Sequence, residues 1–249
     1  MIILKTDEQI EKMHEAGKLL AEVHRQLRTR VVPGVTTMEL DKFVEEFLIE
    51  RGAYPEQKGY QGFPYSICAS INDEICHGYP REEVLNEGDI VTIDMVVNLD
   101  GYLADSAWSY GVGKISEEKQ NLLDVTKEAL YRGIDAVKVG NRLGDIGHAI
   151  QSYVEPLGYS VVRDFIGHGI GKDMHEDPQV LHYGKPGRGL RLMEGMVFTI
   201  EPMINTGKYN VMIDDNGWTA RTIDGGMSAQ YEHTLALTKD GVIILTEQD

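Results

Sequence analysis

The chain has 249 residues, of which 42% are hydrophobic and 26% charged, a composition typical of one large globular domain or two small ones. Its net charge of −16 argues against nucleic-acid binding, which needs a basic face. No run approaches the ~18–20 apolar residues that span a bilayer, the N-terminus has no signal-peptide core, and two cysteines are too few for a disulfide scaffold. We therefore expect a cytoplasmic protein with reduced thiols and no membrane partner.

The first half begins with two predicted helices. Thr6 and Gln9 form a capping-box pattern, and apolar residues then follow at helical spacing until Pro33-Gly34. Thr36 with Glu39 predicts a second helix, which Gly52 should stop. A Gly-, Pro- and Tyr-rich loop follows over residues 54–79 and contains a short strand around SICASI. The strand EGDIVTID, residues 87–94, comes next.

The second half repeats this order. Residues 117–137 predict a long helix, Gly140 breaks it as Gly34 breaks the first, and a second amphipathic stripe ends at Gly158. The strand EGMVFTIE, residues 194–201, then matches EGDIVTID, and a closing hairpin turns at Lys239-Asp240-Gly241. The repeat predicts an α+β fold with pseudo-twofold symmetry and helices on one face of a curved antiparallel sheet. We expect one domain over residues 1–249, with halves of about 1–115 and 116–249 and a site between them.

A hairpin brings two acids together. Asp100-Gly101 is a two-residue turn signal, and pairing back from it sets Val96 opposite Asp105. Asp94 and Asp105 then share one face as diagonal neighbours roughly 7–8 Å apart at the backbone. Because two such carboxylates repel each other, the pair predicts a positive charge between them.

The second half offers further oxygen and nitrogen ligands. His168 lies in GHGIG, Glu201 ends the repeated strand, and Glu232 lies in the alternating run AQYEHTLAL. With Asp94 and Asp105 they make a hard, oxygen-rich set that favours Mn, Fe or Co, with Zn also compatible. Two divalent ions would balance the four carboxylates and acidify a bridging water.

Other residues have alternative interpretations. His77 and His175 lie in Gly- and Pro-rich loops, where each could stabilise an oxyanion or be an ordinary loop histidine. His14 and His24, on the first helix, are expected in solvent, and His148 and His182 have no evident partner. Taken alone, Tyr60, Phe63 and Trp218 are more typical of a core than of a pocket, and each acid alone is more typical of a strand end or a solvated face.

The sequence closely resembles the bacterial type I methionine aminopeptidases over nearly its whole length. The motifs that carry the resemblance are SINDEICHGYP, GDIVTIDMVVNLDGYLADSAW, GHGIGKDMHEDP, FTIEPM and AQYEHT. The resemblance implies the pita-bread fold. It implies two metal ions held by Asp94, Asp105, His168, Glu201 and Glu232, with Asp105 and Glu232 bridging.

The same resemblance implies the remaining roles. His77 and His175 become catalytic, Glu201 the general base, and bridging hydroxide the nucleophile that attacks the scissile carbonyl. The substrate pocket falls on Tyr60, Phe63, Cys68 and Trp218 together with both histidines. Asn72 and Ser228 lie where members bind a monovalent cation through backbone oxygens. Gln57 and Met174 depart from the Cys and Phe that many members carry at the pocket rim.

The function implied is removal of the N-terminal methionine from nascent chains, near the ribosome, when the second residue is small. We expect a monomer. A rival enzyme class is the proline-specific peptidase of the same fold, which usually carries a large N-terminal domain that this sequence lacks. A rival of another class is a metal-free binding module, whose members have lost ligands that are all present here. The chain also lacks the zinc-binding extension of eukaryotic type I enzymes and the helical insertion of type II enzymes.

Overall fold

The computed structural model describes residues 1–248. Its helices are α1 (Asp7–Leu27), α2 (Thr37–Ile49), α3 (Glu117–Asp135) and α4 (Leu143–Val154), with short 3₁₀ turns η1 (Tyr60–Gly62) and η2 (Glu155–Leu157). The order is two helices and then strands, followed by two helices and then strands again. The helical part of the predicted repeat is therefore confirmed.

Local hydrogen bonds explain where the first two helices begin. Thr6 Oγ1 accepts from the Gln9 amide at 3.3 Å, and Gln9 Oε1 accepts from the Thr6 amide at 2.9 Å. Thr36 and Glu39 exchange the same pair of bonds at 3.0 and 2.8 Å. Both predicted capping boxes are confirmed, and each satisfies two amides that a helix start leaves without partners.

The predicted hairpin forms with the predicted register. β4 (Ile90–Leu99) pairs with β5 (Tyr102–Gly111), with Leu99 opposite Tyr102 and Val96 opposite Asp105. The turn residues Asp100 and Gly101 both have positive φ, 53° and 81°, as a two-residue turn that matches strand twist requires. Asp94 and Asp105 therefore lie on one face of the hairpin.

The described strands form four antiparallel sheets, and the hairpin belongs to the first of them. Along its edge lie β1 (Ala53–Pro55) and β2 (Cys68–Ile71). β3 (Glu74–Cys76) pairs with β12 (Ala220–Thr222), which pairs with β11 (Val211–Ile213). β10 (Met203–Asn205) lies between β6 (Ser160–Val161) and β13 (Ser228–Gln230). The last sheet runs in the order β15 (Gly241–Ile244), β14 (His233–Thr238), β9 (Val197–Ile200), β7 (Gly167–Gly169) and β8 (Glu176–Val180).

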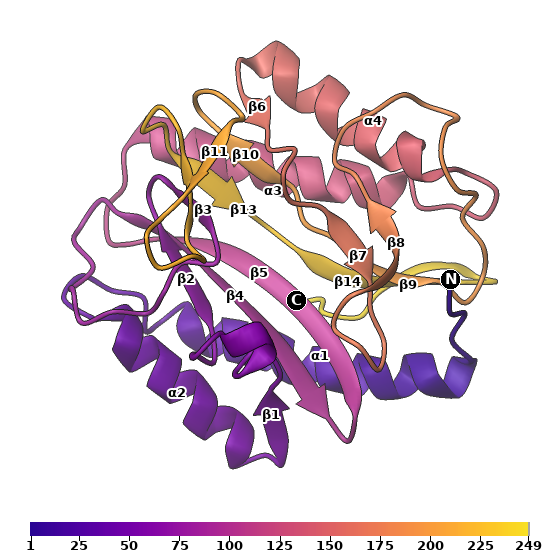
Figure 1. Cartoon of the computed structure of the whole chain (residues 1–249), viewed down its shortest axis with the longest axis horizontal. Helices are drawn as coiled ribbons and strands as arrows, with labels where there is room; N and C mark the ends of the chain where they lie inside the picture. The colour runs from indigo at the N-terminus through magenta and orange to yellow at the C-terminus, as the bar shows by residue number, and fades with distance from the viewer. Residues whose placement is uncertain (249) are drawn as a thin grey trace.

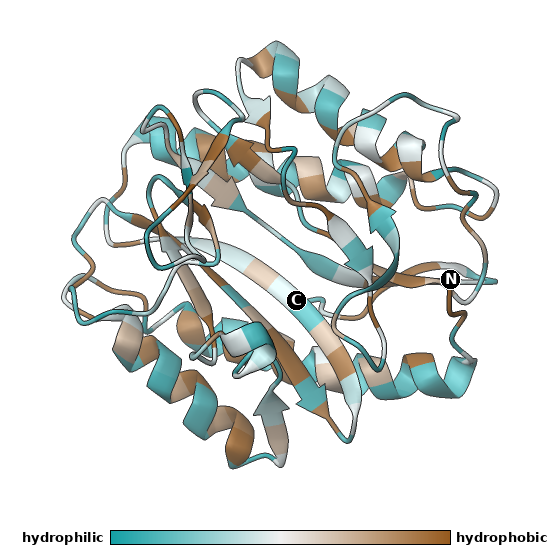
Figure 2. Cartoon of the chain, in the orientation of Figure 1, coloured by the Kyte–Doolittle hydropathy of each residue, from teal (hydrophilic) through white to brown (hydrophobic). Residues whose placement is uncertain are grey.

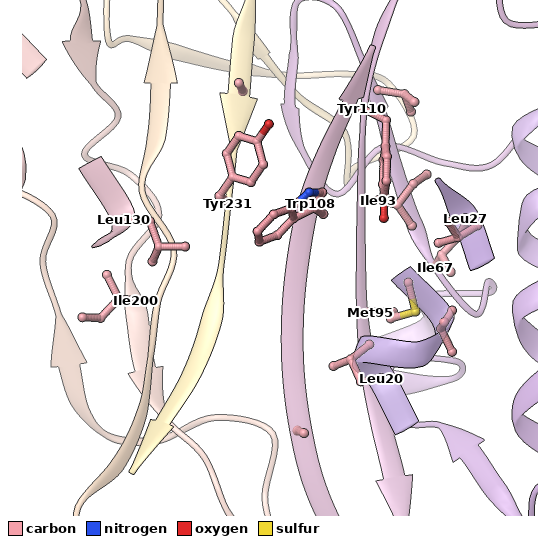
Figure 3. Packing of buried hydrophobic residues seen from close by; sticks show 14 of the residues in the cluster. Leu20, Leu27, Ile67, Ile93, Met95, Trp108, Tyr110, Leu130, Ile200 and Tyr231 are labelled. Carbon is pink, nitrogen blue, oxygen red and sulfur yellow. The ribbon is translucent and has the colours of Figure 1, made fainter. Parts of the chain in front are cut away.

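Helices cover the sheets from outside. α1 contacts β4 and β5, whereas α3 contacts β9, β10 and β13 (Figure 1). The helix surfaces alternate between apolar and polar residues (Figure 2). The apolar residues enter one core that runs from Leu20 and Ile93 in the first half to Leu130 and Ile200 in the second (Figure 3). This layering leaves the opposite face of the strands free to form a site.

The two halves meet along β5. In Figure 1 it runs beside β13 and β14. Hydrogen bonds from side-chain hydroxyls join these strands. Ser109 Oγ donates to Gln230 O at 2.8 Å, and Thr234 Oγ1 donates to Asp105 O at 2.8 Å. These bonds bring the C-terminal strands against the hairpin that carries Asp94 and Asp105.

The expectation that His24 is solvated is wrong. His24 is fully buried where α1 crosses β5, with its Nδ1 2.7 Å from the Tyr110 hydroxyl. Burial lowers its pKa to about 4, so the ring is neutral. The spacing of apolar residues predicts the helix, but only the position of β5 against α1 shows that His24 faces the core.

Within the residues that the structure describes, no helix is long and apolar enough to cross a membrane.

Candidate active site

A cavity of about 660 Å³ opens between the two halves. Eleven of the predicted site residues line it: Tyr60, Phe63, Cys68, His77, Asp94, Asp105, His168, His175, Glu201, Trp218 and Glu232. They come from segments up to 172 residues apart in sequence, from Tyr60 to Glu232. The fold therefore brings the candidate acids, histidines and aromatic residues to one place, whereas Asn72 and Ser228 are not among the lining residues.

The acids meet on the floor of this cavity. Asp94 lies on β4 and Asp105 on β5, while Glu201 follows β9 and Glu232 precedes β14. Contacts with β5 hold Glu232 in place. Its backbone amide donates to Ala107 O at 2.9 Å, and Ser106 Oγ donates to its carbonyl oxygen at 2.8 Å.

Burial raises the pKa of every acid in this set. It raises the pKa of Asp94 to about 7, and burial together with the charge of Asp94 raises that of Glu201 to about 8. The pKa values of Asp105 and Glu232 lie well above their ordinary range because both groups are buried beside other carboxylates. Asp105, Glu201 and Glu232 are buried and Asp94 is half-buried. Because such a cluster of acids is costly without a positive partner, it requires bound cations or protons.

His168 supplies the test of whether a metal fits. Its Nδ1 lies 3.0 Å from Gly169 O, so Nδ1 carries the hydrogen and Nε2 keeps a lone pair. That Nε2 lies 3.6 Å from Asp105 Oδ2 and 3.5 Å from Glu201 Oε1. Burial lowers the His168 pKa to about 4, so the ring is neutral and offers no charge to these oxygens.

The donor set therefore fits divalent metal. Ligand atoms of Asp105, His168 and Glu232 lie within 4.8 Å of one another, and Asp105 Oδ1 is buried without a hydrogen-bond partner. An imidazole nitrogen that faces carboxylate oxygens is the arrangement that a hard or borderline cation stabilises. The backbone oxygen that receives Nδ1–H is the kind of outer partner that orients metal-binding histidines.

Neighbouring side chains orient Glu201. Thr199 Oγ1 donates to Oε1 at 2.8 Å, and Gln230 Nε2 donates to Oε2 at 3.3 Å. The Glu201 backbone amide donates to Nε2 of His182 at 3.1 Å. The sequence offered no evident partner for His182, and the structure shows that its partner is this amide.

The two loop histidines face the cavity in neutral form. Burial lowers the pKa of His77 to about 4 and lowers that of His175 as well. His77 has a positive φ of 56°, and its ring stands edge-on to Phe165 at 5.2 Å between centroids. His175 Nδ1 lies 2.9 Å from the Tyr60 hydroxyl. If Tyr60 donates this bond, Nε2 of His175 carries the hydrogen and becomes a donor.

An aromatic pocket adjoins the acids. The rings of Phe63 and Trp218 are 5.1 Å apart and nearly perpendicular, and Phe63 is almost fully buried. Burial raises the pKa of Cys68 well above its ordinary value, so it is a neutral thiol. Phe165 and Met203 also line the cavity, although the sequence analysis did not single them out. Each stands two or three residues from a selected ligand, which is the signal that could have indicated them.

The rim residues Gln57 and Met174 both line the cavity and are buried. Met174 packs into an apolar cluster with Ile10 and Val96, so it fills space at the base of the His175 loop. Gln57 hydrogen-bonds to the backbone of β4 at Asp94 and Val96.

A lysine stands near the predicted monovalent-cation site. The carbonyl oxygen of Asn72 accepts from the Ser228 amide at 2.9 Å. Lys119 Nζ donates to Gly88 O at 2.6 Å and to Asn72 Oδ1 at 3.2 Å. A positive charge thus already lies beside Asn72, and the cation site stays a prediction.

Comparison with known proteins agrees with this geometry. Residues 11–239 match the model of metallopeptidase family M24. A methionine aminopeptidase of Clostridium acetobutylicum is 51% identical over 247 residues, which cover 99% of each chain. The chain belongs to family M24, within the bacterial type I methionine aminopeptidases.

Solved structures confirm the fold. The crystal structure of methionine aminopeptidase from Rickettsia prowazekii superposes with a TM-score of 0.98 at 47% identity, covering 99% of this chain and 100% of that one. A prolidase from Pyrococcus furiosus has a TM-score of 0.80 at 23% identity, covering 99% of this chain and 66% of that one, and shares the fold alone. The predicted pita-bread fold is confirmed, and membership of a metallopeptidase family implies divalent metal.

Proposed function

We propose that this chain removes the N-terminal methionine from nascent proteins and peptides whose second residue is small. The observation that carries the proposal is the set of four carboxylates, three of them buried, and one neutral histidine that line a cavity with an aromatic pocket. A relative that aligns over 99% of this chain is named methionine aminopeptidase.

Two divalent ions, Mn, Fe, Co or Zn, are the cofactors we propose for this site. Asp94, Asp105, His168, Glu201 and Glu232 would hold them. When bound, such ions supply a water acidic enough to act as a nucleophile near neutral pH, and they polarise the scissile carbonyl.

The protein's own residues would then handle substrate and protons. Glu201, which Thr199 and Gln230 orient, can accept the proton of the attacking water and return it to the leaving amine. His77 and His175, both neutral, can donate hydrogen bonds to the developing oxyanion and to the scissile amide.

The aromatic pocket suits a methionine side chain. Tyr60, Phe63, Cys68 and Trp218 present aromatic faces and a thiol, and thioether sulfur packs favourably against aromatic rings. We expect the enzyme to act as a monomer in the cytoplasm, on chains leaving the ribosome, without contact to nucleic acid or membrane.

The test measures methionine release and metal content on the same sample. Met-Ala-Ser should be cleaved far faster than Leu-Ala-Ser or Met-Lys-Ser. Dialysis against EDTA should abolish cleavage, and Mn, Fe or Co should restore it. Full activity in a verified metal-free sample would refute the metal-dependent mechanism, and equal rates on all peptides would indicate a broad aminopeptidase.

A further inference from the structure

The outer edge of β4 has a gap between its two strand partners. β1 pairs Ala53–Pro55 with Leu99–Val97, and β2 pairs Cys68–Ile71 with Asp94–Val91. Neither strand reaches Met95 or Val96. The backbone amide of Glu56 donates to Val96 O at 2.9 Å, but the Val96 amide hydrogen still needs a partner, and Asp94, opposite Cys68, is the last residue of β4 that β2 covers.

The side chain of Gln57 fills this gap. Its Oε1 accepts from the Val96 amide at 2.7 Å, and its Nε2 donates to Asp94 O at 3.1 Å. One side-chain amide thus joins two backbone groups of β4, as a residue of a neighbouring strand would. Gln57 is only 7% exposed, so these bonds are shielded from water.

We propose that Gln57 is a positioning residue for Asp94. Asp94 lies opposite Ala107 of β5 on one side and opposite Cys68, the first residue of β2, on the other. The two bonds of Gln57, to Asp94 O and to the Val96 amide, continue the restraint on this edge of β4 past the end of β2. This added restraint limits the directions in which the Asp94 carboxylate can point. This inference rests on the proposed function, in which Asp94 holds one divalent ion.

The competing explanation is that Gln57 only forms part of the wall of the substrate pocket. Gln57 Nε2 also lies 3.7 Å from Cys68 Sγ, so a substitution could act on methionine binding alone. The two explanations differ in their readouts, because positioning changes metal affinity whereas a wall changes the KM for peptide.

Gln57→Met tests the inference, since methionine keeps the length and removes both hydrogen bonds. Gln120→Met is the matched control: it makes the same substitution at an exposed side chain of α3, which is not among the residues that line the cavity. Gln57→Asn is the second variant, because it keeps the amide but is one methylene too short to reach both partners.

The first measurement is amide exchange at Val96 in the metal-free protein, followed by NMR. A buried amide that loses its acceptor should exchange about tenfold faster or more in Gln57→Met and Gln57→Asn, but not in Gln120→Met. The second measurement is metal titration by calorimetry. We expect affinity for one ion to fall about 10–100-fold, the range found when an outer partner of a metal ligand is removed, with the other ion little changed.

The kinetic readout separates the two explanations. Turnover on Met-Ala-Ser lost by Gln57→Met should return at higher metal concentration, with KM within a few-fold of the parent value. Unchanged metal affinity with a raised KM would overturn the inference in favour of a wall role, and unchanged Val96 exchange would overturn it outright. A parent protein that binds no divalent ion would refute the proposed function and this inference with it. Normal binding by both parent and Gln57→Met would refute the inference alone.

Discussion

Removing metal should make the stability of this protein fall steeply as pH rises above 7. In the metal-free protein, burial raises the pKa of Asp94 to about 7 and of Glu201 to about 8, and raises those of Asp105 and Glu232 well above their ordinary values. In the unfolded chain all four lose their protons near pH 4. The folded form therefore binds more protons than the unfolded form at neutral pH, and stability must decrease as pH increases.

The magnitude follows from the number of retained protons. Between pH 7 and 8, Asp105 and Glu232 stay protonated in the folded metal-free state, while Asp94 and Glu201 together retain about one proton on average. Each of these roughly three retained protons contributes about 1.4 kcal/mol per pH unit. The free energy of unfolding should then fall by about 4 kcal/mol over that unit of pH, which for a chain of this size lowers Tm by about 8–16 °C.

Buried histidines affect the pH dependence of stability only below about pH 6.5. Burial lowers the pKa of His24 to about 4 and of His182 to about 3, against about 6.5 in the unfolded chain. Their contribution is present above pH 6.5 and is lost as pH falls below it, opposite in sign to that of the acids. Above pH 7 their effect is nearly constant, so the acids dominate.

The assay is thermal unfolding at pH 7.0 and 8.0 with chelator and with saturating Mn. The chelated protein should show the fall in Tm, and the Mn-bound protein should not, since bound carboxylates have already lost their protons. Asp94→Asn should reduce the fall, because it removes one titrating group. A Tm of the chelated protein that stays level or rises between these pH values would refute the reasoning.

Three further predictions concern single side chains. His77→Ala should keep its metal content but lose about 10²–10³ in turnover on Met-Ala-Ser, the usual cost of removing an oxyanion donor; near-normal turnover would exclude that role. Tyr60→Phe keeps the ring and removes the hydroxyl beside His175, so kcat should fall roughly 3–10-fold while KM stays close to the parent value, and a raised KM alone would indicate a role in the pocket. Arg221 and Arg81 both contact the fully buried Glu74, and Arg221→Met removes one of these two cations. The free energy of unfolding measured in urea should fall by about 2–3 kcal/mol, and no fall would mean that Arg81 alone is enough to stabilise Glu74.

Local patterns predicted much of the fold because they depend on hydrogen bonds between near neighbours. The capping boxes at Thr6 and Thr36 and the turn at Asp100-Gly101 needed no knowledge of distant contacts. The turn set the register of β4 and β5, and the register placed Asp94 and Asp105 on one face. Repeat matching then indicated Glu201 as the acid of the second half.

Long-range packing decided what these patterns could not. His24 and Leu20 both fit a helical stripe, but only the position of β5 under α1 shows that a histidine enters the core and bonds to Tyr110. Lys119 also comes beside Asn72 only after α3 packs against the first half. Such contacts join residues 47 to 86 positions apart, and no local rule specifies them.

The sequence by itself determined the helix starts, the hairpin and the identity of the candidate ligands, because capping and two-residue turns are fixed by a few adjacent residues. Only the tertiary structure decided how the acids meet. The seam between β5 and the C-terminal strands carries Glu232 to the hairpin through Ala107 and Ser106, and the gap between β1 and β2 makes Gln57 a partner of Asp94. Both depend on backbone groups that must be paired once burial removes them from water, and the structure alone shows which groups those are.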